Sequence, residues 1–259
     1  MNEFIKCRLC GEKAKFLWSK KILFKYEVKY FQCEHCQYLM TEEPFWLEEA
    51  YSKSINLSDT GYISRNLTLA NFVSILLFFC FSKDSVFLDF AGGYGVFVRL
   101  MRDKGFDFFW EDKYTKNLFA GGFEWDNHKK LDAVTAFEVL EHLVNPLDEI
   151  DNLLKYSNTL ILSTEVFHGN CPSADWNYLA LNHGQHIGFF NKKSLSFIAQ
   201  KYELRFYSFG GIHVFTRNTQ LSAFKFYLTI FCFKLKLHHV VKKILKSKMI
   251  GDNLEMSKR

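Results

Sequence analysis

The stretch SVFLDFAGGYG, residues 85–95, decides the fold, and the rest of the chain can be interpreted outward from it. Its apolar run ends in Asp89. Three glycines follow, Gly92, Gly93 and Gly95. Residues 96–104 then have the apolar spacing of a helix. A strand, a glycine-rich turn and a helix in this order place backbone N–H groups at a helix N-terminus, where they can face a ligand.

A second apolar segment, residues 106–110, predicts the next strand, and Asp112 stands just beyond its end. An acid at this position is where an α/β protein holds the diol of a nucleoside ribose. The turn lacks the third glycine of the dinucleotide fingerprint but carries Asp89 ahead of its glycines. Together these features indicate a nucleoside-binding α/β unit.

Predicted strands and helices alternate over the rest of the middle region. Residues 131–137 and 159–167 are apolar strands, and a helix with regularly spaced leucines lies between them. Residues 192–202 are helical, and residues 204–216 predict a closing hairpin around two glycines. This alternation predicts a doubly wound α/β sheet.

Four of the seven cysteines form two C-x-x-C pairs, Cys7 with Cys10 and Cys33 with Cys36. The two-residue gap lets both sulfurs of a pair approach one tetrahedral ion. Aromatic and β-branched residues 15–30, between the pairs, predict strands that bring them together. The spacing predicts a zinc ribbon, stapled by its ion because about 40 residues bury too little apolar surface. A redox role for either pair is disfavoured, since no βαβ unit lies beside it.

The chain has 259 residues, of which 48% are hydrophobic, an ordinary composition for one or two globular domains. Residues 221–259 hold 9 of the 33 lysines and arginines but only 2 of the 28 acids. The remaining residues therefore carry a net charge of −2, which argues against a dedicated nucleic-acid-binding domain. No export signal is visible, so we expect a cytoplasmic protein whose cysteines are thiols or metal ligands.

Two apolar segments raise the question of membrane contact. Residues 70–81 are shorter than the roughly 20 residues that span a bilayer, so we expect a buried helix there. In the tail, apolar residues 221–233 precede the basic stretch 234–248. The tail fits the inner face of an anionic membrane, and it fits equally a helix pair packed on the folded domain or in a dimer.

The motifs LDFAGGYG, Asp112 and AFEVLEHLVNP resemble the successive motifs of class I S-adenosylmethionine-dependent methyltransferases. Residues 1–220 as a whole resemble a bacterial subgroup in which a four-cysteine zinc ribbon precedes this domain. TEEPFWLEEAYS and LSDTGYISRN are similar to the linker of that subgroup, and HGQHIGFF is similar to its active-site loop.

The resemblance implies a Rossmann-like, seven-stranded sheet with one antiparallel strand, preceded by the ribbon. It also implies S-adenosylmethionine contacts from the turn, a ribose contact from the second-strand acid, and the edge of the cofactor at the tip of the next strand. The residues so implied are Asp89, Gly92, Gly93, Gly95, Asp112, Phe137 and Glu138. Two residues depart from the usual pattern, since Ala91 and Gln37 stand where glycine is common.

Histidines are the candidate catalytic bases. A hydroxyl that accepts a methyl group must lose a proton as it attacks, and histidine has a pKa suited to take it. His186 and His183 lie in the loop after the strand at 159–167, on the rim that also carries Asp89. We favour His186, keep His142 in reserve, and expect one of the two loop histidines only to hold the loop.

The segment after the strand at 131–137 allows a second interpretation. Glu138, Glu141 and His142 resemble the divalent-metal cluster of O-methyltransferases that act on quinone precursors and small RNAs. Helix capping and cofactor contact explain the same residues, because acids favour the first turn of a helix. The sequence leaves the metal open.

The chain thus divides into four predicted parts: a zinc ribbon at 1–40, a linker with N-terminal helices at 41–84, a methyltransferase domain at 85–220 and a basic amphipathic tail at 221–259. We expect methyl transfer to an oxygen of a small polar acceptor. The subgroup's association with surface glycans points to a nucleotide-linked sugar. One alternative is an RNA methyltransferase that docks RNA on its ribbon, which the net negative charge before residue 221 disfavours. The other is a non-catalytic binding module, which two histidines beside the pocket disfavour. The oligomeric state is not predicted.

Overall fold

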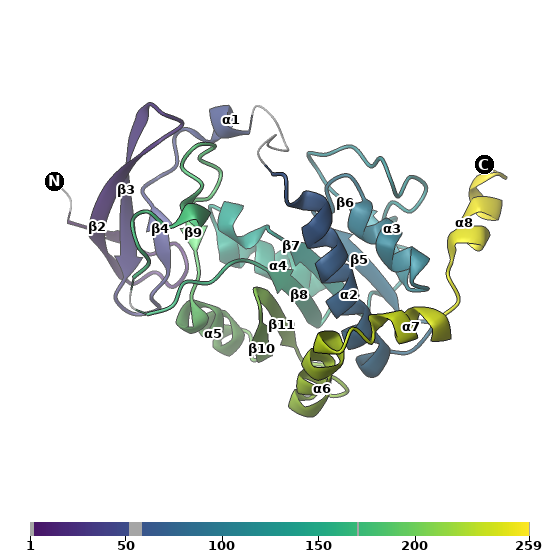
Figure 1. The fold of residues 1–259 in the computed structure, drawn as a ribbon. Helices are drawn as coiled ribbons and strands as arrows, with labels where there is room; N and C mark the ends of the chain where they lie inside the picture. The colour runs from purple at the N-terminus through teal and green to yellow at the C-terminus, as the bar shows by residue number, and fades with distance from the viewer. Residues whose placement is uncertain (1–2, 52–58, 170, 259) are drawn as a thin grey trace. The chain divides into compact units, whose positions relative to one another are not determined.

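The computed structural model describes residues 3–51, 59–169 and 171–258, and the chain divides into two compact units (Figure 1). The first unit comprises Met1–Asn56, Glu138–Leu153 and Leu162–His213. The second comprises Leu57–Phe137, Leu154–Ile161 and Val214–Arg259. Each unit is therefore assembled from segments that lie far apart in the sequence.

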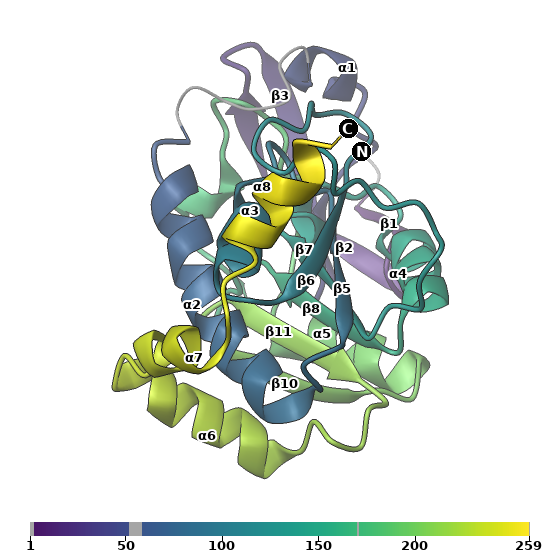
Figure 2. The same ribbon diagram turned by 90° about the vertical axis from the view of Figure 1, so that its right-hand side faces the viewer.

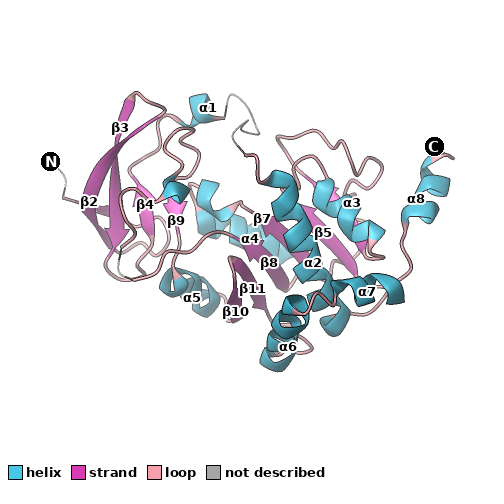
Figure 3. Ribbon diagram, in the orientation of Figure 1, coloured by secondary structure: helices cyan, strands magenta, loops and turns pink. Residues whose placement is uncertain are grey.

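The first unit contains a five-stranded antiparallel sheet with the order β1-β2-β3-β4-β9 (Figure 3). Its strands are β1 (Phe4–Lys6), β2 (Lys13–Ile22), β3 (Tyr26–Cys33), β4 (Leu39–Thr41) and β9 (Gly188–Phe189). Leu39 of β4 pairs with Phe189 of β9, so the HGQHIGFF segment adds a strand to the ribbon. Tyr30, Trp46 and Phe189 are buried in one core. The strands between the cysteine pairs were predicted from sequence, whereas this fifth strand was not.

A six-stranded sheet has the order β10-β11-β8-β7-β5-β6. Its strands are β5 (Val86–Phe90), β6 (Asp107–Glu111), β7 (Ala133–Phe137), β8 (Thr159–Ser163), β10 (Arg205–Phe209) and β11 (Ile212–Thr216). β5 pairs in parallel with β6 on one side and with β7 on the other. The α/β class with parallel central strands is therefore confirmed.

The predicted seventh strand is absent from this sheet in the described part of the chain. Beyond β6 there is only an isolated parallel bridge between Trp110 and Glu124. The Trp110 N–H donates to the Phe123 carbonyl, and the Trp125 N–H donates to the Trp110 carbonyl, both at 2.8 Å. Two glycines and the polar residues 126–130 flank this bridge, so no alternating apolar run is present to extend the pairing.

Helices occupy the connections and the tail. They are α1 (Leu47–Ala50), α2 (Tyr62–Cys80), α3 (Val96–Asp103), α4 (Pro146–Tyr156), α5 (Lys192–Lys201), α6 (Ala223–Lys234), α7 (His238–Ile244) and α8 (Met249–Met256), with short 3₁₀ turns η1 (Leu140–His142) and η2 (Asn177–Leu179).

Helix α2 is the buried helix expected from the apolar run at 70–81, and it begins earlier, at Tyr62. Among the described residues it is the one helix long and apolar enough to cross a membrane by length and composition. Its most apolar window is 56% buried within the structure, and Phe72, Ile75 and Leu76 are fully enclosed. Burial of this kind is typical of a core helix, so its composition is weak evidence for a membrane span.

The tail packs on α2 through its first helix. Phe72 of α2 meets Phe226 and Phe233 of α6 edge-on, with ring centroids 6.2 and 5.5 Å apart. Figure 2 shows α6 and α7 running beside α2. One face of α6 therefore packs on α2 within the second unit. This agrees with the interpretation of the tail as helices packed on the folded domain.

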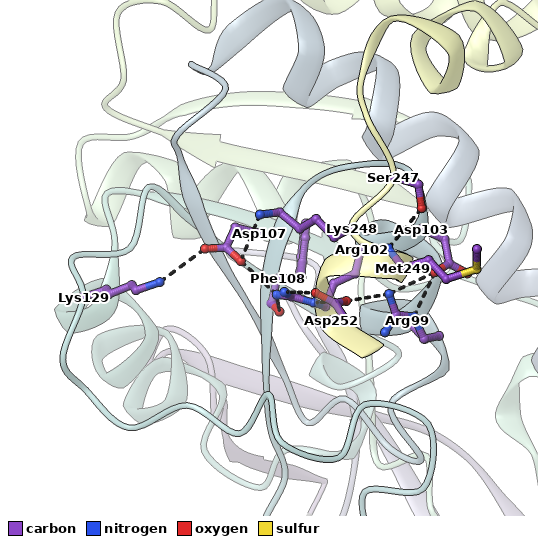
Figure 4. Close-up of polar contacts among 10 residues, drawn as sticks. All are labelled: Arg99, Arg102, Asp103, Asp107, Phe108, Lys129, Ser247, Lys248, Met249 and Asp252. Atoms are coloured by element: carbon purple, nitrogen blue, oxygen red, sulfur yellow. Dashed lines mark hydrogen bonds and ion pairs between the residues drawn. The ribbon is translucent and has the colours of Figure 1, made fainter. Parts of the chain in front are cut away.

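The last helix is held by a buried ion-pair network (Figure 4). Arg102 of α3 donates to both carboxylate oxygens of Asp252 at 2.9 and 2.7 Å, and Arg99 donates to the same carboxylate at 2.7 Å. Arg102 also donates to Asp107 of β6 at 2.8 Å. The Arg102 and Asp252 side chains are only 5% and 7% exposed. Bidentate geometry at this depth makes the pair a specific clasp between α8 and α3.

We predict that Asp252→Ala lowers the free energy of unfolding by about 1.5–3 kcal/mol, because the buried Arg102 guanidinium loses its bidentate partner and keeps only its hydrogen bonds to Asp107 and the Phe108 carbonyl. Burial alone would raise the pKa of Asp252, but hydrogen bonds from Arg102 and Arg99 outweigh it and hold that pKa below its ordinary value. The stabilisation is therefore complete above about pH 4, the unfolded pKa, and is lost as pH falls through the folded one.

Urea unfolding of the wild type, Asp252→Ala and the exposed control Asn253→Ala, at pH 7 and pH 3, measures this effect. An unchanged free energy of unfolding in Asp252→Ala at pH 7 would contradict the clasp.

Candidate functional site

The four paired cysteines come together in the first unit. Their sulfurs all lie within 4.8 Å of one another, with Cys7 Sγ 3.7 Å from Cys36 Sγ and Cys10 Sγ 3.3 Å from Cys33 Sγ. Sulfurs placed tetrahedrally at 2.3 Å around zinc would be about 3.8 Å apart. The donor set and its spacing thus fit a zinc ion.

The two cysteine loops have the same backbone design. Gly11 N–H donates to the Cys7 carbonyl at 2.9 Å, and Gln37 N–H donates to the Cys33 carbonyl at 3.0 Å. Gly11 and Gln37 occupy equivalent left-handed positions, with φ of +81° and +63°. Gln37 therefore keeps the turn that glycine usually makes, with some backbone strain.

The four sulfurs are poorly suited to be thiolates together without a cation. Burial raises the pKa of Cys10 to about 12, and the hydrogen bond to Cys7 together with burial also raises the pKa of Cys36. A metal ion favours the thiolate form of such ligands and releases their protons.

The glycine-rich turn lies in the second unit, between β5 and α3. A Cβ atom at Gly92 would lie 2.8 Å from Asp89 Oδ2 and from Trp110 Cδ1, and one at Gly95 would lie 2.6 Å from Asn117 Oδ1. Gly95 also has a left-handed backbone, with φ of +83°. Only glycine fits these two positions. Ala91 adopts φ of +54°, a conformation that costs a side-chain-bearing residue about 1–2 kcal/mol.

Asp89 is buried beside this turn. Its Oδ1 accepts a 2.6 Å hydrogen bond from Thr135 Oγ1 of β7. Burial raises the pKa of Asp89 to about 7, and the charge of Asp112 adds to this, while the Thr135 hydrogen bond opposes it. A cationic or hydrogen-bond-donating group beside the carboxylate would favour its ionised form.

The N-terminus of α3 directly follows the glycine-rich turn. No side chain of the described residues caps it, and its first turn carries no acid. The first N–H groups of a helix have no partner within the helix. Backbone donors and the positive end of the helix dipole thus stand next to the turn.

Asp112 ties the turn to the loop after β6. Its Oδ2 accepts from Gly93 N at 2.9 Å, and its Oδ1 accepts from Tyr114 N and Thr115 N, each at 2.8 Å. A carboxylate has about four acceptor positions. Asp112 therefore organises two loops in this structure and keeps acceptor capacity on Oδ2 for a ligand hydroxyl.

The predicted cofactor residues after β7 lie in different surroundings. In the second unit, Phe137 packs edge-on against Phe97 of α3, with ring centroids 4.8 Å apart. Glu138, in the first unit, has φ of +54°. Its N–H donates to Ser163 Oγ at 3.0 Å, and Ser163 Oγ donates back to Glu138 Oε1 at 2.6 Å. The end of β8 thus fixes the Glu138 carboxylate.

A second cluster in the first unit joins Glu141, His142 and His186, whose ligand atoms lie within 4.8 Å of one another. Glu141 is fully buried and accepts a 2.6 Å hydrogen bond from Tyr178 Oη. The His142 and His186 rings are 4.9 Å apart. The His183 and His186 ring centroids are 5.3 Å apart. His183 Nδ1 accepts a hydrogen bond from the Gln185 N–H at 3.3 Å.

Backbone carbonyls orient both clustered imidazoles. His186 Nδ1 is 2.7 Å from the backbone carbonyl oxygen of Tyr178, and His142 Nδ1 is 3.1 Å from the backbone carbonyl oxygen of Gln185. A carbonyl only accepts, so we assign the ring proton to Nδ1 and the acceptor lone pair to Nε2 in both. Burial lowers the pKa of His142, which favours its neutral form. Each Nε2 can therefore take a proton or bind a metal ion.

Sequence reasoning missed the residues that support this cluster. Tyr51 Oη lies 3.0 Å from His142 Nδ1, and Gln185 donates to the Ala50 carbonyl at 2.8 Å. Tyr178 supplies both the hydroxyl for Glu141 and the carbonyl for His186. Tyr51 and Gln185 stand in the stretches TEEPFWLEEAYS and HGQHIGFF, but no role was predicted for either, and Tyr178 stands in no recognisable motif. Only their contacts identify all three.

Comparisons with known proteins match these features to one family. Residues 64–208 match a family described as "Methyltransferase domain". The chain is similar to the structure of magnesium protoporphyrin IX methyltransferase (ChlM) from Synechocystis PCC 6803 with bound SAH, at 14% identity and a TM-score of 0.45, covering 65% of this chain and 90% of that one. No curated protein matches the sequence.

Two further solved structures are similar to part of the chain. The plantazolicin methyltransferase BpumL in complex with SAH has 11% identity and a TM-score of 0.46, covering 70% of this chain and 80% of that one. The mitomycin 7-O-methyltransferase MmcR has 14% identity and a TM-score of 0.41, covering 66% of this chain and 59% of that one. The chain thus spans less than two thirds of MmcR.

Proposed function

This chain belongs to the methyltransferase domain family and is an S-adenosylmethionine-dependent methyltransferase, and we propose that it methylates an oxygen of a small polar acceptor. Cofactor binding is supported by the buried Asp89 beside an uncapped helix N-terminus, in a turn where two positions admit only glycine. The observation that supports methylation of an oxygen is His186, whose Nδ1 lies 2.7 Å from the Tyr178 carbonyl oxygen and which can therefore take a proton at Nε2. S-adenosylmethionine supplies the methyl group from a sulfonium and combines a cationic amine, a carboxylate and a ribose.

We propose that the turn residues Asp89, Gly92, Gly93 and Gly95 contact the methionine part of the cofactor. The ionised Asp89 would face its ammonium group, which would lower the raised pKa of Asp89 on binding. The ribose hydroxyls would donate to Asp112. Phe137 and Glu138 would line the edge of the cofactor, as the sequence resemblance implies.

A histidine would act as the base. As the acceptor oxygen forms its bond to the methyl carbon, the sulfonium–carbon bond breaks and the acceptor proton must leave. We propose that His186 Nε2 takes this proton, because the Tyr178 carbonyl holds the proton on Nδ1 and leaves Nε2 as the acceptor. His142 is the reserve base. His183 accepts from a backbone N–H of its own loop, which supports a structural role.

The acceptor is proposed to be phosphorylated, such as a nucleotide-linked sugar. A cavity of about 270 Å³ in the first unit is lined by His168, Lys192 and Lys193 together with Gln37, Phe167, Gly169 and Asn191. Lysine side chains suit phosphate oxygens. An RNA acceptor is disfavoured by the net charge of −2 carried by residues 1–220. We place the reaction in the cytoplasm, where the four thiols stay reduced.

A divalent ion is a second candidate for the cluster, favoured by the short separations among Glu141, His142 and His186. Imidazoles that donate Nδ1–H to backbone carbonyls are typical of metal ligands. In that case both histidines would hold the ion instead of taking the proton. Turnover measured after gel filtration, with and without added Mg²⁺ or Mn²⁺, distinguishes the two: the base role requires no added ion.

The direct test is a transfer assay with tritiated S-adenosylmethionine against nucleotide sugars, glycan extracts and total RNA. Label in a nucleotide sugar or its glycan product supports the proposal. Label only in RNA would overturn it.

For zinc, we predict one ion per chain in protein purified without chelators, held by Cys7, Cys10, Cys33 and Cys36. Because metal binding is coupled to folding and Cys33→Ser removes one of four ligands, this variant should lose the zinc and lower the thermal midpoint. Elemental analysis measures the content, with the exposed Cys171→Ser as the control that keeps it. Full zinc content in Cys33→Ser would refute the assignment.

For the ribose contact, Asp112→Ala should weaken S-adenosylhomocysteine binding at least tenfold, since a charge-assisted hydrogen bond is worth about 1.5–3 kcal/mol. Asp112 also holds Gly93, so the comparison needs a ligand that lacks a hydroxyl. By calorimetry, the wild type should prefer S-adenosylhomocysteine over its 2′-deoxy analogue, and Asp112→Ala should not. An equal loss for both ligands would restrict Asp112 to organising the turn.

For the base, His186→Ala should lower turnover by roughly 10²–10⁴-fold while S-adenosylmethionine binding stays intact. His183→Ala is the matched control from the same loop and should retain most activity. If His186→Ala and His142→Ala each keep more than a tenth of wild-type turnover, the base lies elsewhere and positioning carries the reaction.

A further inference from the structure

Helix α6 has a second apolar face, opposite the one that packs on α2. Phe224, Tyr227 and Phe231 are spaced three and four residues apart, so they lie in one stripe. They are 76%, 67% and 59% exposed. The inward positions Phe226, Thr229 and Cys232 are buried. Helices on a protein surface normally carry polar residues outside, so this aromatic stripe needs an explanation.

The stripe continues past the end of α6. Leu235 follows at the next position with the same spacing and is 55% exposed. In α7, Val240 and Ile244 are four residues apart and 48% and 53% exposed. We call Phe224, Tyr227, Phe231, Leu235, Val240 and Ile244 together the tail stripe. Its length and composition exceed the scattered apolar residues of an ordinary surface.

The charge around the stripe has one sign. Residues 221–251 contain seven lysines and no aspartate or glutamate. Five of these lysines are exposed: Lys234, Lys236, Lys242, Lys243 and Lys246. The next acid in the sequence is Asp252, which accepts two hydrogen bonds from Arg102 and one from Arg99. The segment that carries the stripe is thus cationic at neutral pH.

We propose that the tail stripe is a docking surface for an anionic lipid bilayer. Aromatic side chains enter the interfacial region of a membrane, and neighbouring lysines bind anionic headgroups. A helix of 12 residues is about 18 Å long, against about 30 Å for a hydrocarbon core, so α6 would lie in the interface and not span it.

Other occupants fit less well. A second copy of the chain would bring two lysine-rich segments together, and like charges at an interface are costly. A nucleic acid would match the charge, but the aliphatic Leu235, Val240 and Ile244 offer no ring on which bases could stack. The combination of branched aliphatic residues, aromatic rings and lysines is matched by an anionic lipid surface.

Co-sedimentation of the full chain with vesicles tests the proposal. Phosphatidylcholine vesicles containing about a third phosphatidylglycerol should bind the protein at least tenfold more tightly than phosphatidylcholine alone, and added salt should weaken the binding. Truncation at Gln220 is unsuitable, because it would uncover Phe72 and remove Asp252. Point variants of exposed residues leave this packing in place.

The variant Phe224→Ser with Phe231→Ser should lower the partition coefficient at least tenfold, and Lys242→Glu with Lys243→Glu should remove the preference for anionic vesicles. The control is Phe24→Ser, a Phe of 75% exposure in the turn after β2. It should bind as the wild type does. Circular dichroism confirms folding of each variant.

Equal binding of the wild type and the double phenylalanine variant would overturn the proposal. So would a dimer seen by analytical ultracentrifugation, or an RNA complex seen by gel shift, that the phenylalanine variant abolishes while vesicle binding is absent. The test is independent of the methyl acceptor, because it measures no turnover.

Discussion

The absence of space around the turn between β5 and α3 is the constraint on which the second unit depends. Trp110 and Asn117 approach the turn so closely that Gly92 and Gly95 cannot carry a side chain. Because the backbone fits, the Trp110 indole N–H donates to the Gly93 carbonyl at 2.9 Å and Asp112 accepts from the Gly93 N–H. Helix α3 begins directly after the turn, and its Arg102 donates to Asp107 of β6 and to Asp252 of α8. The lack of space for side chains at Gly92 and Gly95 thus fixes the backbone of the turn. It also fixes the start of α3, the helix to which α8 is bound.

In the first unit, the ribbon supports the histidine loop. Arg8, between Cys7 and Cys10, donates to the Ile187 carbonyl at 2.6 Å, next to His186. Trp46 donates to the Gly184 carbonyl at 2.8 Å. With the β4–β9 pairing, these bonds make the loop part of the ribbon sheet. The ribbon therefore gives the proposed base a rigid position, a role that requires no nucleic acid.

Local patterns in the sequence predict local structure well. The cysteine spacing, the Asp89 turn and the apolar run of α2 each depend on neighbours within about 30 residues. The β4–β9 pairing and the Arg102–Asp252 clasp join segments about 150 residues apart, and short-range patterns carry no signal for them. The prediction of a seventh strand is not confirmed by the described residues. The resemblance supplied the count, whereas residues 112–130 lack the alternating apolar residues that a paired edge strand needs.

The central claim is that the turn after β5 holds S-adenosylmethionine, and amide hydrogen exchange tests it most directly. On addition of S-adenosylhomocysteine, peptides covering residues 89–98 and 110–118 should become protected, because the backbone N–H groups at the start of α3 and the loop held by Asp112 would contact the ligand. Residues 26–33 of β3 should not change. Saturating ligand that leaves exchange at residues 89–98 unaltered would contradict the account.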